Sequence, residues 1–153
     1  MTPTPTPPPP VSRPLERPLA QAVQAAVHPA VPAGYAAMPP GCGWQSDPGP
    51  AAGFTAYAVV WPGSTTPDGG TVAAPDADAD QVVQVTYVGR VAEQADEMRD
   101  RGRGALLGAT LTVTGRHCWP VRLADSQAVQ RDDDTTPPVW FAADRYLIHS
   151  VPA

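Results

Sequence analysis

The sequence contains no lysine and no asparagine, and all ten of its basic residues are arginine. Fifteen acidic residues outnumber them, so the formal net charge is −5 at pH 7. Proteins that bind nucleic acid without a specific site do so through clustered positive charge, which neutralises the phosphates. The charge balance therefore disfavours nucleic acid as a direct partner.

Cysteine is scarce, because Cys42 and Cys118 are the only two in the chain. Two cysteines cannot build a disulfide framework, and these two do not have the C-x-x-C spacing of a metal or redox motif. We therefore expect two reduced thiols.

Long apolar runs are absent as well: no segment approaches the ~18 residues of a membrane-spanning helix, and the N-terminus lacks the pattern of an export signal. We expect neither export nor insertion into a membrane.

Recognisable catalytic motifs are also missing. The three histidines, at positions 28, 117 and 149, lack the spacing of metal ligands, and no serine lies in a G-x-S-x-G turn. The glycine-rich segment 102–108 falls inside a helical pattern and lacks the Lys-Ser/Thr pair of a phosphate-binding loop. We therefore expect no enzymatic activity and no cofactor.

Two acidic runs are the remaining candidate sites. The first places carboxylates at alternate positions, Asp76, Asp78 and Asp80. It resembles the start of a calcium loop, but the glycine and glutamate that an EF-hand needs further on are missing. In the second run, 132–134, consecutive side chains of an extended chain cannot all point at one ion. We expect solvated loops or contacts with a neighbouring subunit, and a metal- or small-ligand-binding module is the alternative of a different class.

The composition favours one folded domain. Hydrophobic residues make up 42% of the 153 residues and charged residues 16%, which is typical of a globular chain of single-domain length. Fourteen of the 21 prolines lie in the first fifty residues. Because proline lacks a backbone N–H, we expect residues 1–12 to form a disordered arm and 13–153 to form the domain. Residues 29–52, rich in proline, glycine and alanine, predict a long irregular loop.

Hydrophobic periodicity predicts the first elements. Apolar residues recur every four positions over 15–27, which indicates a helix with Pro18 in its opening turn. Residues 54–61 and 81–88 are rich in β-branched and aromatic residues and predict two strands that could pair as a long hairpin. The nearly continuous apolar content of the second strand favours a central position with both faces covered. Residues 65–80 between the two strands predict a turn-rich loop.

The second half of the chain begins with a helix. Its apolar face is Val91, Ala95, Met98, Gly102 and Ala105 or Leu106. Opposite charges at helical spacing favour three ion pairs on its polar side. They are Glu97 with Arg101, Asp96 with Arg99, and Asp100 with Arg103. Gly102 and Gly104 are expected to weaken its last turns, and Gly108 to end it.

A small hairpin and a long strand are predicted after that helix. Residues 111–113 and 117–123 flank a Thr114-Gly115 turn, and Pro120 places the second of these strands at a sheet edge. Residues 139–151 predict a long final strand that bends near 142–144. This order of elements indicates an α+β fold, with a mostly antiparallel sheet of four to five strands and two helices packed on it.

Four segments in this order and spacing resemble the tail terminator proteins of long-tailed bacteriophages. They are residues 84–90 (QVTYVGR), a helix with Gln94, Ala95, Arg99 and Arg101, residues 127–133, and residues 137–146 (PPVWFAADRY). The resemblance covers the chain from about residue 54 to the end.

The resemblance implies a structural role in the virion. Such proteins form a hexameric ring on the end of the completed tail tube, stop its polymerisation and present a surface to the head connector. The implied partners are copies of the same chain, the tail tube protein and a head–tail connector or stopper. The implied location is the neck region of the virion, after assembly in the host cytoplasm. Another neck component, such as a connector or stopper, is the nearest alternative.

Exposed charged residues are the candidates for the subunit or tube interface, because a ring needs contacts between unlike surfaces of neighbouring copies. The first group is Arg131, Asp132, Asp133 and Arg145, and the second is Asp76, Asp78 and Asp80. Tyr87, Met98 and Trp119 are expected to be buried for structural reasons.

Overall fold

A computed structural model describes residues 16–45, 53–67, 69, 72 and 77–153. These residues form two helices, a mixed eight-stranded sheet and a separate two-stranded sheet. The predicted proline-rich arm, 1–12, lies outside the described residues. The α+β class and the mostly antiparallel pairing are confirmed, but the sheet is larger than predicted and is mixed, because it contains one parallel pair.

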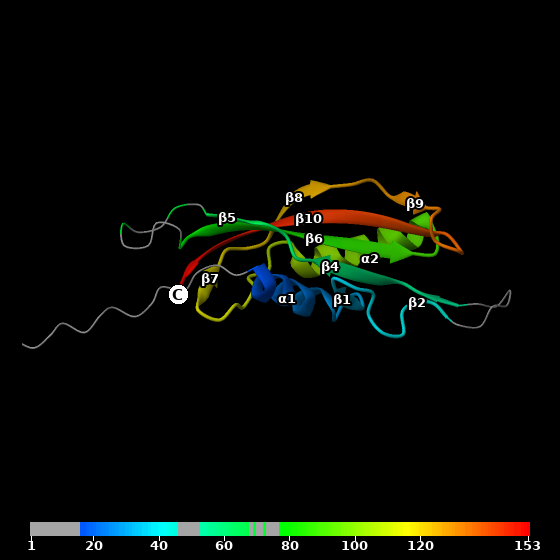
Figure 1. Ribbon diagram of the computed structural model, residues 1–153, viewed down its shortest axis with the longest axis horizontal. Coiled ribbons are helices and arrows are strands. Elements are labelled where there is room, and N and C mark those ends of the chain that lie inside the picture. Colours follow the sequence, from blue (N-terminus) through cyan, green and yellow to red (C-terminus); the bar gives the residue numbers. More distant parts are fainter. Residues whose placement is uncertain (1–15, 46–52, 68, 70–71, 73–76) are drawn as a thin grey trace, which may run out of the picture.

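Both helices pack on the same face of the large sheet (Figure 1). Helix α1 (Glu16–Val27) begins with Pro18 in its first turn and buries Leu19, Val23 and Val27, as its periodicity predicts. Helix α2 (Ala92–Leu106) lies over the two central strands. It ends just before Gly108, whose φ of 77° favours glycine. Val91 is exposed at the N-cap position and does not belong to the buried face that the sequence predicts.

Two long antiparallel strands form the centre of the sheet. They are β6 (Ala79–Gly89) and β10 (Val139–Pro152), with Gly89 opposite Trp140 and Ala79 opposite Ser150. The other edge of β6 pairs with β4 (Tyr57–Trp61), which confirms the predicted pairing of these two segments. Further along, β6 also pairs with β5 (Thr65–Pro67), inside the segment that was predicted to be a loop.

The proline-rich segment 29–52 is more regular than its composition predicts. It contains β1 (Ala33–Tyr35), which runs parallel to β4 and makes the large sheet mixed. It also contains β2 (Gly43–Trp44), which pairs with β3 (Phe54–Thr55). The predicted strand over 54–61 is therefore divided at Ala56. These short strands depend on partners elsewhere in the chain, which no local pattern reveals.

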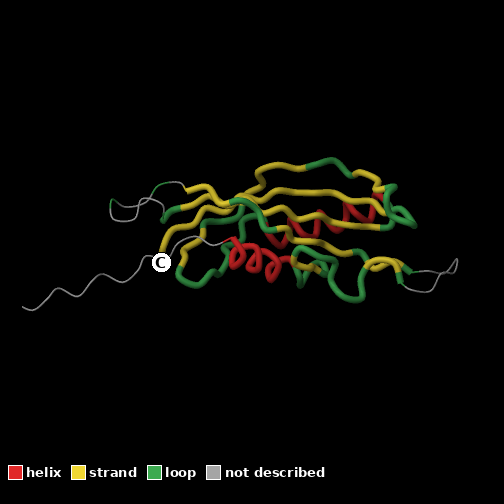
Figure 2. Tube along the Cα trace, viewed as in Figure 1, coloured by secondary structure: helices red, strands yellow, loops and turns green. Residues whose placement is uncertain are grey.

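The predicted hairpin around Thr114-Gly115 is wrong. Its first arm makes only a single bridge, Val113 to Arg116, and its second arm is interrupted at Pro120, which cannot donate to a ladder. Three short strands instead pair one after another along the same edge of β10 (Figure 2). They are β7 (Arg116–Cys118), β8 (Arg122–Ser126) and β9 (Gln130–Asp132). The irregularity in β10 lies between Arg145 and Tyr146, slightly beyond the predicted bend.

The core lies between the helices and one face of the sheet. Val83, Val85 and Tyr87 of β6 are buried there against α1 and α2, together with Tyr146 and Ile148 of β10. Alternate residues of β6 point to the opposite face and are mostly half-buried, so the prediction that both faces of this strand are covered is wrong. Among the described residues, no helix is long and apolar enough to cross a membrane.

Candidate assembly surface

The face of the sheet that the helices leave uncovered carries aligned rows of side chains. Strand register places residues of β4, β6 and β10 directly opposite one another, and side chains alternate between the two faces of each strand. The first three rows on the open face are Tyr57–Val88–Phe141, Val59–Thr86–Ala143 and Trp61–Gln84–Arg145. Two further rows follow, Val82–Leu147 and Asp80–His149.

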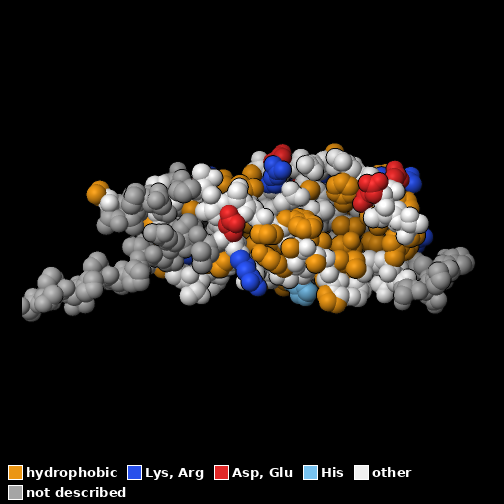
Figure 3. Space-filling view, in the orientation of Figure 1, with side chains coloured by type: hydrophobic (Ala, Val, Ile, Leu, Met, Phe, Trp, Pro, Cys, Tyr) orange, Lys and Arg blue, Asp and Glu red, His pale blue; other side chains and the backbone are white. Residues whose placement is uncertain are grey.

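This open face is largely apolar. Val59, Val88 and Ala143 are at most 6% exposed although no helix covers them. Trp61 is 41% exposed, and its indole N–H donates a hydrogen bond to Thr86 Oγ1 at 3.2 Å. Figure 3 shows hydrophobic side chains gathered over the middle of this face, with charged groups mainly around the margin. Apolar patches on protein surfaces are often sites of contact with other macromolecules, which makes this face a candidate assembly surface.

The edge formed by β7, β8 and β9 is also available for contacts. All five residues of β8 are exposed, and β8 pairs only with β10 among the described strands. An edge strand presents unpaired backbone groups to a neighbouring chain. The open face and this edge meet along β10, so one partner could cover both.

The predicted interface residues occupy separate parts of this surface. Arg131 and Asp133 form an exposed ion pair of 2.7 Å beside Asp132. Arg145 lies in the middle of the open face, opposite Asp125 of β8 in register. The structure therefore brings the first three of these candidates together and leaves Arg145 apart from them.

The earlier acidic run does not form a single site. Asp80 lies at the far end of the open face, where its carboxylate pairs with Nδ1 of His149 at 2.7 Å. Asp78 precedes β6, and its N–H donates to the carbonyl of Gly69 at 3.0 Å. Asp76 lies outside the described residues. The interface roles of both groups of candidates stay predictions.

Sequence reasoning missed the aromatic part of this surface. Tyr57 and Phe141 were assigned only to strands, and Trp61 to the core or a contact, because a half-exposed face cannot be distinguished from a buried one by composition. Trp119, expected to be buried, is 45% exposed, although its N–H still donates to the His149 carbonyl of β10 at 2.9 Å. Its ring contacts that of His149 edge to face, with 4.9 Å between the ring centroids.

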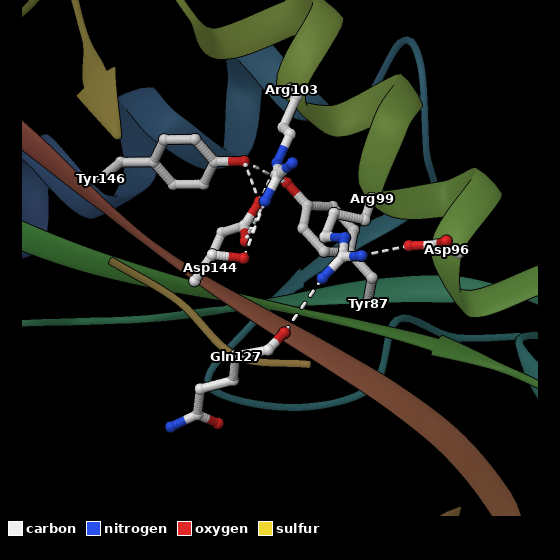
Figure 4. Close-up of polar contacts among 8 residues, drawn as sticks. Tyr87, Asp96, Arg99, Arg103, Gln127, Asp144 and Tyr146 are labelled. Atoms are coloured by element: carbon white, nitrogen blue, oxygen red, sulfur yellow. Dashed lines mark hydrogen bonds and ion pairs between the residues drawn. The ribbon is translucent and has the colours of Figure 1, made fainter. Parts of the chain in front are cut away.

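A buried polar network holds the scaffold behind the open face (Figure 4). Arg103 of α2 binds the Asp144 carboxylate of β10 through two hydrogen bonds, of 2.7 and 2.9 Å, and also reaches Ser126 of β8. Tyr146 donates to the same carboxylate at 3.2 Å, and its hydroxyl lies 2.8 Å from that of Tyr87 in β6. The network therefore joins one helix to three strands.

The ion pairs predicted on α2 are confirmed in part. Glu97 pairs with Arg101, and Asp96 pairs with Arg99, as helical spacing predicts. The third pair, Asp100 with Arg103, does not form, because Arg103 turns toward Asp144. Arg99 also donates to the carbonyl of Gln127 at 3.0 Å, which ties the helix to the loop after β8.

The network fixes the ionisation of its members. Burial raises the pKa of Asp144, but hydrogen bonds from Arg103, Ser126 and Tyr146 and the guanidinium charge outweigh this effect, so its pKa lies below the ordinary value. Burial raises the pKa of Tyr87 and of Tyr146 far above neutrality, so both hydroxyls stay protonated. The carboxylate is therefore the one group of the network that acid can titrate.

We expect the protein to lose stability as the pH falls below about 4, because Asp144 has a lower pKa in the folded chain than in the unfolded one. Its ionised form stabilises the fold above the unfolded pKa, and this contribution disappears as the pH falls through the folded pKa. Urea unfolding at a series of pH values between about 6 and 3 measures this loss of stability. The Asp144→Asn variant should show a shallower pH dependence, whereas Asp125→Asn on the exposed β8 should follow the wild type.

Metal chemistry has no support in the described part of the chain. No group of three or more histidine, cysteine, aspartate or glutamate side chains there is arranged to hold an ion. Cys42 and Cys118 are free thiols, and burial raises the pKa of both.

Comparison with known proteins gives a structural likeness. No protein-family model matches the chain, and no curated protein sequence matches it. The fold is similar to that of a chain in a solved structure described as the virion of a native gene transfer agent particle. The TM-score is 0.54 at 18% sequence identity, and the match covers 84% of each chain. This protein therefore shares its fold with a chain of a gene transfer agent virion.

Proposed function

We propose that this protein is a structural component of a phage-like virion. More specifically, we propose that it forms a ring on the end of the tail tube, stops tube polymerisation and becomes part of the head–tail interface. The observation that carries this proposal is the fold shared with a chain of the gene transfer agent virion over most of both molecules. The resemblance of residues 84–146 to tail terminators supports the same role.

The open face of the sheet supports a role in assembly. An apolar surface with aromatic residues is typical of contacts between proteins, whereas small substrates bind in concave pockets with converging polar groups. Tyr57, Trp61 and Phe141 supply the aromatic groups that often dominate such contacts. A neighbouring copy or the tube protein would cover this face in the assembled particle.

A head–tail connector or stopper is the second candidate, because it would use the same kind of surface. Capping of tubes separates the two roles.

We expect purified protein, added to polymerising tail-tube subunits, to give short tubes with a ring at one end in electron micrographs. Six copies of the 16.0 kDa chain give a ring of about 96 kDa. Tubes that grow to the same length with and without the protein would contradict the terminator role, and joining of heads without capping would favour a connector.

We expect Trp61→Arg to weaken capping at least about tenfold, because a buried aromatic contact often contributes more than 1.4 kcal/mol to an interface. The fold should tolerate the change, since Trp61 is partly exposed. Tube length against protein concentration measures the effect, and circular dichroism checks the fold. Leu107→Arg is the matched control, because Leu107 is equally exposed but lies at the end of α2. Equal capping by both variants would exclude the open face as the contact.

A further inference from the structure

A concave site lies at the end of the open face, where the edge ladder is interrupted between β7 and β8. It has a volume of about 330 Å³ and is lined by Asp80, Trp119, Pro120, Arg122, Leu147 and His149. We call it the Arg122 pocket. It exists because Pro120 cannot continue the ladder, so the chain leaves β10 after Trp119, whose N–H donates to the His149 carbonyl at 2.9 Å, and returns to it at Arg122.

The walls of the Arg122 pocket combine one cation with an aromatic surface. Arg122 is exposed and has no hydrogen-bond or ion-pair partner among the described residues, whereas Arg99, Arg101 and Arg103 of α2 are all paired. The Asp80 carboxylate on the wall is already bound to His149. An unpaired guanidinium beside an exposed indole suits a ligand that carries a carboxylate next to an apolar group.

A segment of that composition lies in the turn between β9 and β10. Residues 132–138, which we call the acidic tip, have the sequence Asp-Asp-Asp-Thr-Thr-Pro-Pro. Residues 133–137 are all exposed, and the Asp134 carboxylate forms no hydrogen bond or ion pair with another described residue. The tip thus offers a carboxylate followed within a few residues by two prolines.

The acidic tip is held in one shape before any partner arrives. The Asp134 N–H donates to Asp132 Oδ1 at 2.9 Å, and the Thr135 hydroxyl donates to the Asp132 carbonyl at 3.2 Å. The ion pair of Arg131 with Asp133 adds a further restraint at its base. A preorganised segment loses less conformational entropy on binding than a flexible one.

We propose that the acidic tip of one copy docks in the Arg122 pocket of the next copy. Asp134 would pair with Arg122, and the proline pair would pack on the Trp119 indole, as proline segments do on aromatic grooves. This inference rests on the proposed ring, and it names the contact that links one copy to the next.

The positions of the two surfaces fit a ring. The tip and the pocket lie toward opposite ends of β10, because Val139 pairs with β9 beside the tip and His149 lies in the pocket (Figure 1). Each copy can therefore use its tip on one neighbour and its pocket on the other. Contacts between two different patches propagate head to tail and close into a ring when the rotation allows it.

Charge reversal with rescue tests this contact. We expect Arg122→Glu and Asp134→Arg each to raise the protein concentration at which the oligomer dissociates by at least about tenfold, because each places like charges together. The variant with both changes should recover most of the lost affinity, because the opposite charges then meet again. Sedimentation velocity over a concentration series measures the dissociation. Arg101→Glu on the outer side of α2 is the control and should leave the midpoint unchanged.

The outcomes separate this contact from the proposed function. If Arg122→Glu forms the wild-type oligomer but no longer caps tubes, the pocket binds the tube protein, and the copy-to-copy contact is overturned. If all variants assemble and cap like the wild type, the contact is overturned while the ring stands. A wild-type protein that stays monomeric both alone and on tube ends overturns the ring and the contact together.

Discussion

Arg103→Ala is expected to lower the free energy of unfolding by about 3–5 kcal/mol, because it leaves a buried carboxylate without its cation. Asp144 is 0% exposed, and two of its hydrogen bonds come from Arg103. Asp144→Asn should cost less, about 1–3 kcal/mol, because the Arg103 side chain is 27% exposed and can reach water when its partner is lost. Urea unfolding followed by circular dichroism measures both values.

The control for this prediction is another arginine of the same helix. Arg101 pairs with Glu97 on the exposed side of α2, and such a pair contributes at most about 1 kcal/mol. If Arg101→Ala and Arg103→Ala destabilise the protein equally, the network does not hold the helix to the sheet. An effect confined to Arg103 would show that the position of α2 depends on this buried pair.

Gly102→Ala and Gly104→Ala are expected to change stability in opposite directions although both lie in α2. A Cβ atom at Gly102 would lie 2.2 Å from the Tyr87 hydroxyl oxygen and 2.3 Å from Tyr87 Cε1. Overpacking of this kind costs roughly 1–3 kcal/mol or more, which exceeds the ~1 kcal/mol that alanine gains over glycine in a helix. We therefore expect a lower thermal midpoint and weaker packing around the Tyr87–Tyr146 hydrogen bond.

Gly104 is the matched control for this effect. A Cβ atom there would have no neighbour within 4 Å, so Gly104→Ala should gain about 0.5–1 kcal/mol from helix propensity alone. The thermal unfolding midpoints of the two variants and the wild type give the order of their stabilities directly. A stabilising Gly102→Ala would mean that α2 can shift away from β6, and that the close approach of the two elements is not required.

These predictions bear on assembly because the network lies directly behind the open face. Asp144 and Tyr146 point toward the helices, while their neighbours Ala143, Arg145 and Leu147 point to the open face. Any shift of β10 relative to β6 would break the rows of side chains on the open face. In the proposed assembly role, a rigid scaffold would keep this surface ready for a partner.

The open face and the Arg122 pocket could be predicted only in part. The sequence indicated that charged residues near 131–133 lie together in a loop region, and the structure places them at the tip beside β9. It did not indicate that Trp119 is exposed or that Arg122 lacks a partner among the residues that the structure describes. Both depend on where the chain leaves β10 at Pro120, and this depends on pairing with a strand that lies thirty residues away.

The sequence by itself determined both helices and the segments that contain β4, β6 and β10, because each shows a hydrophobic pattern that matches its own backbone geometry. It also determined that the chain carries no recognisable catalytic motif. Only the tertiary structure decided that β1 runs parallel to β4, that three short strands share one edge of β10, and that Arg103 binds Asp144 and not Asp100. The physical reason is the same in each case. A short strand or a charged side chain gains little free energy locally, so its partner is chosen by which distant groups the folded chain brings within reach.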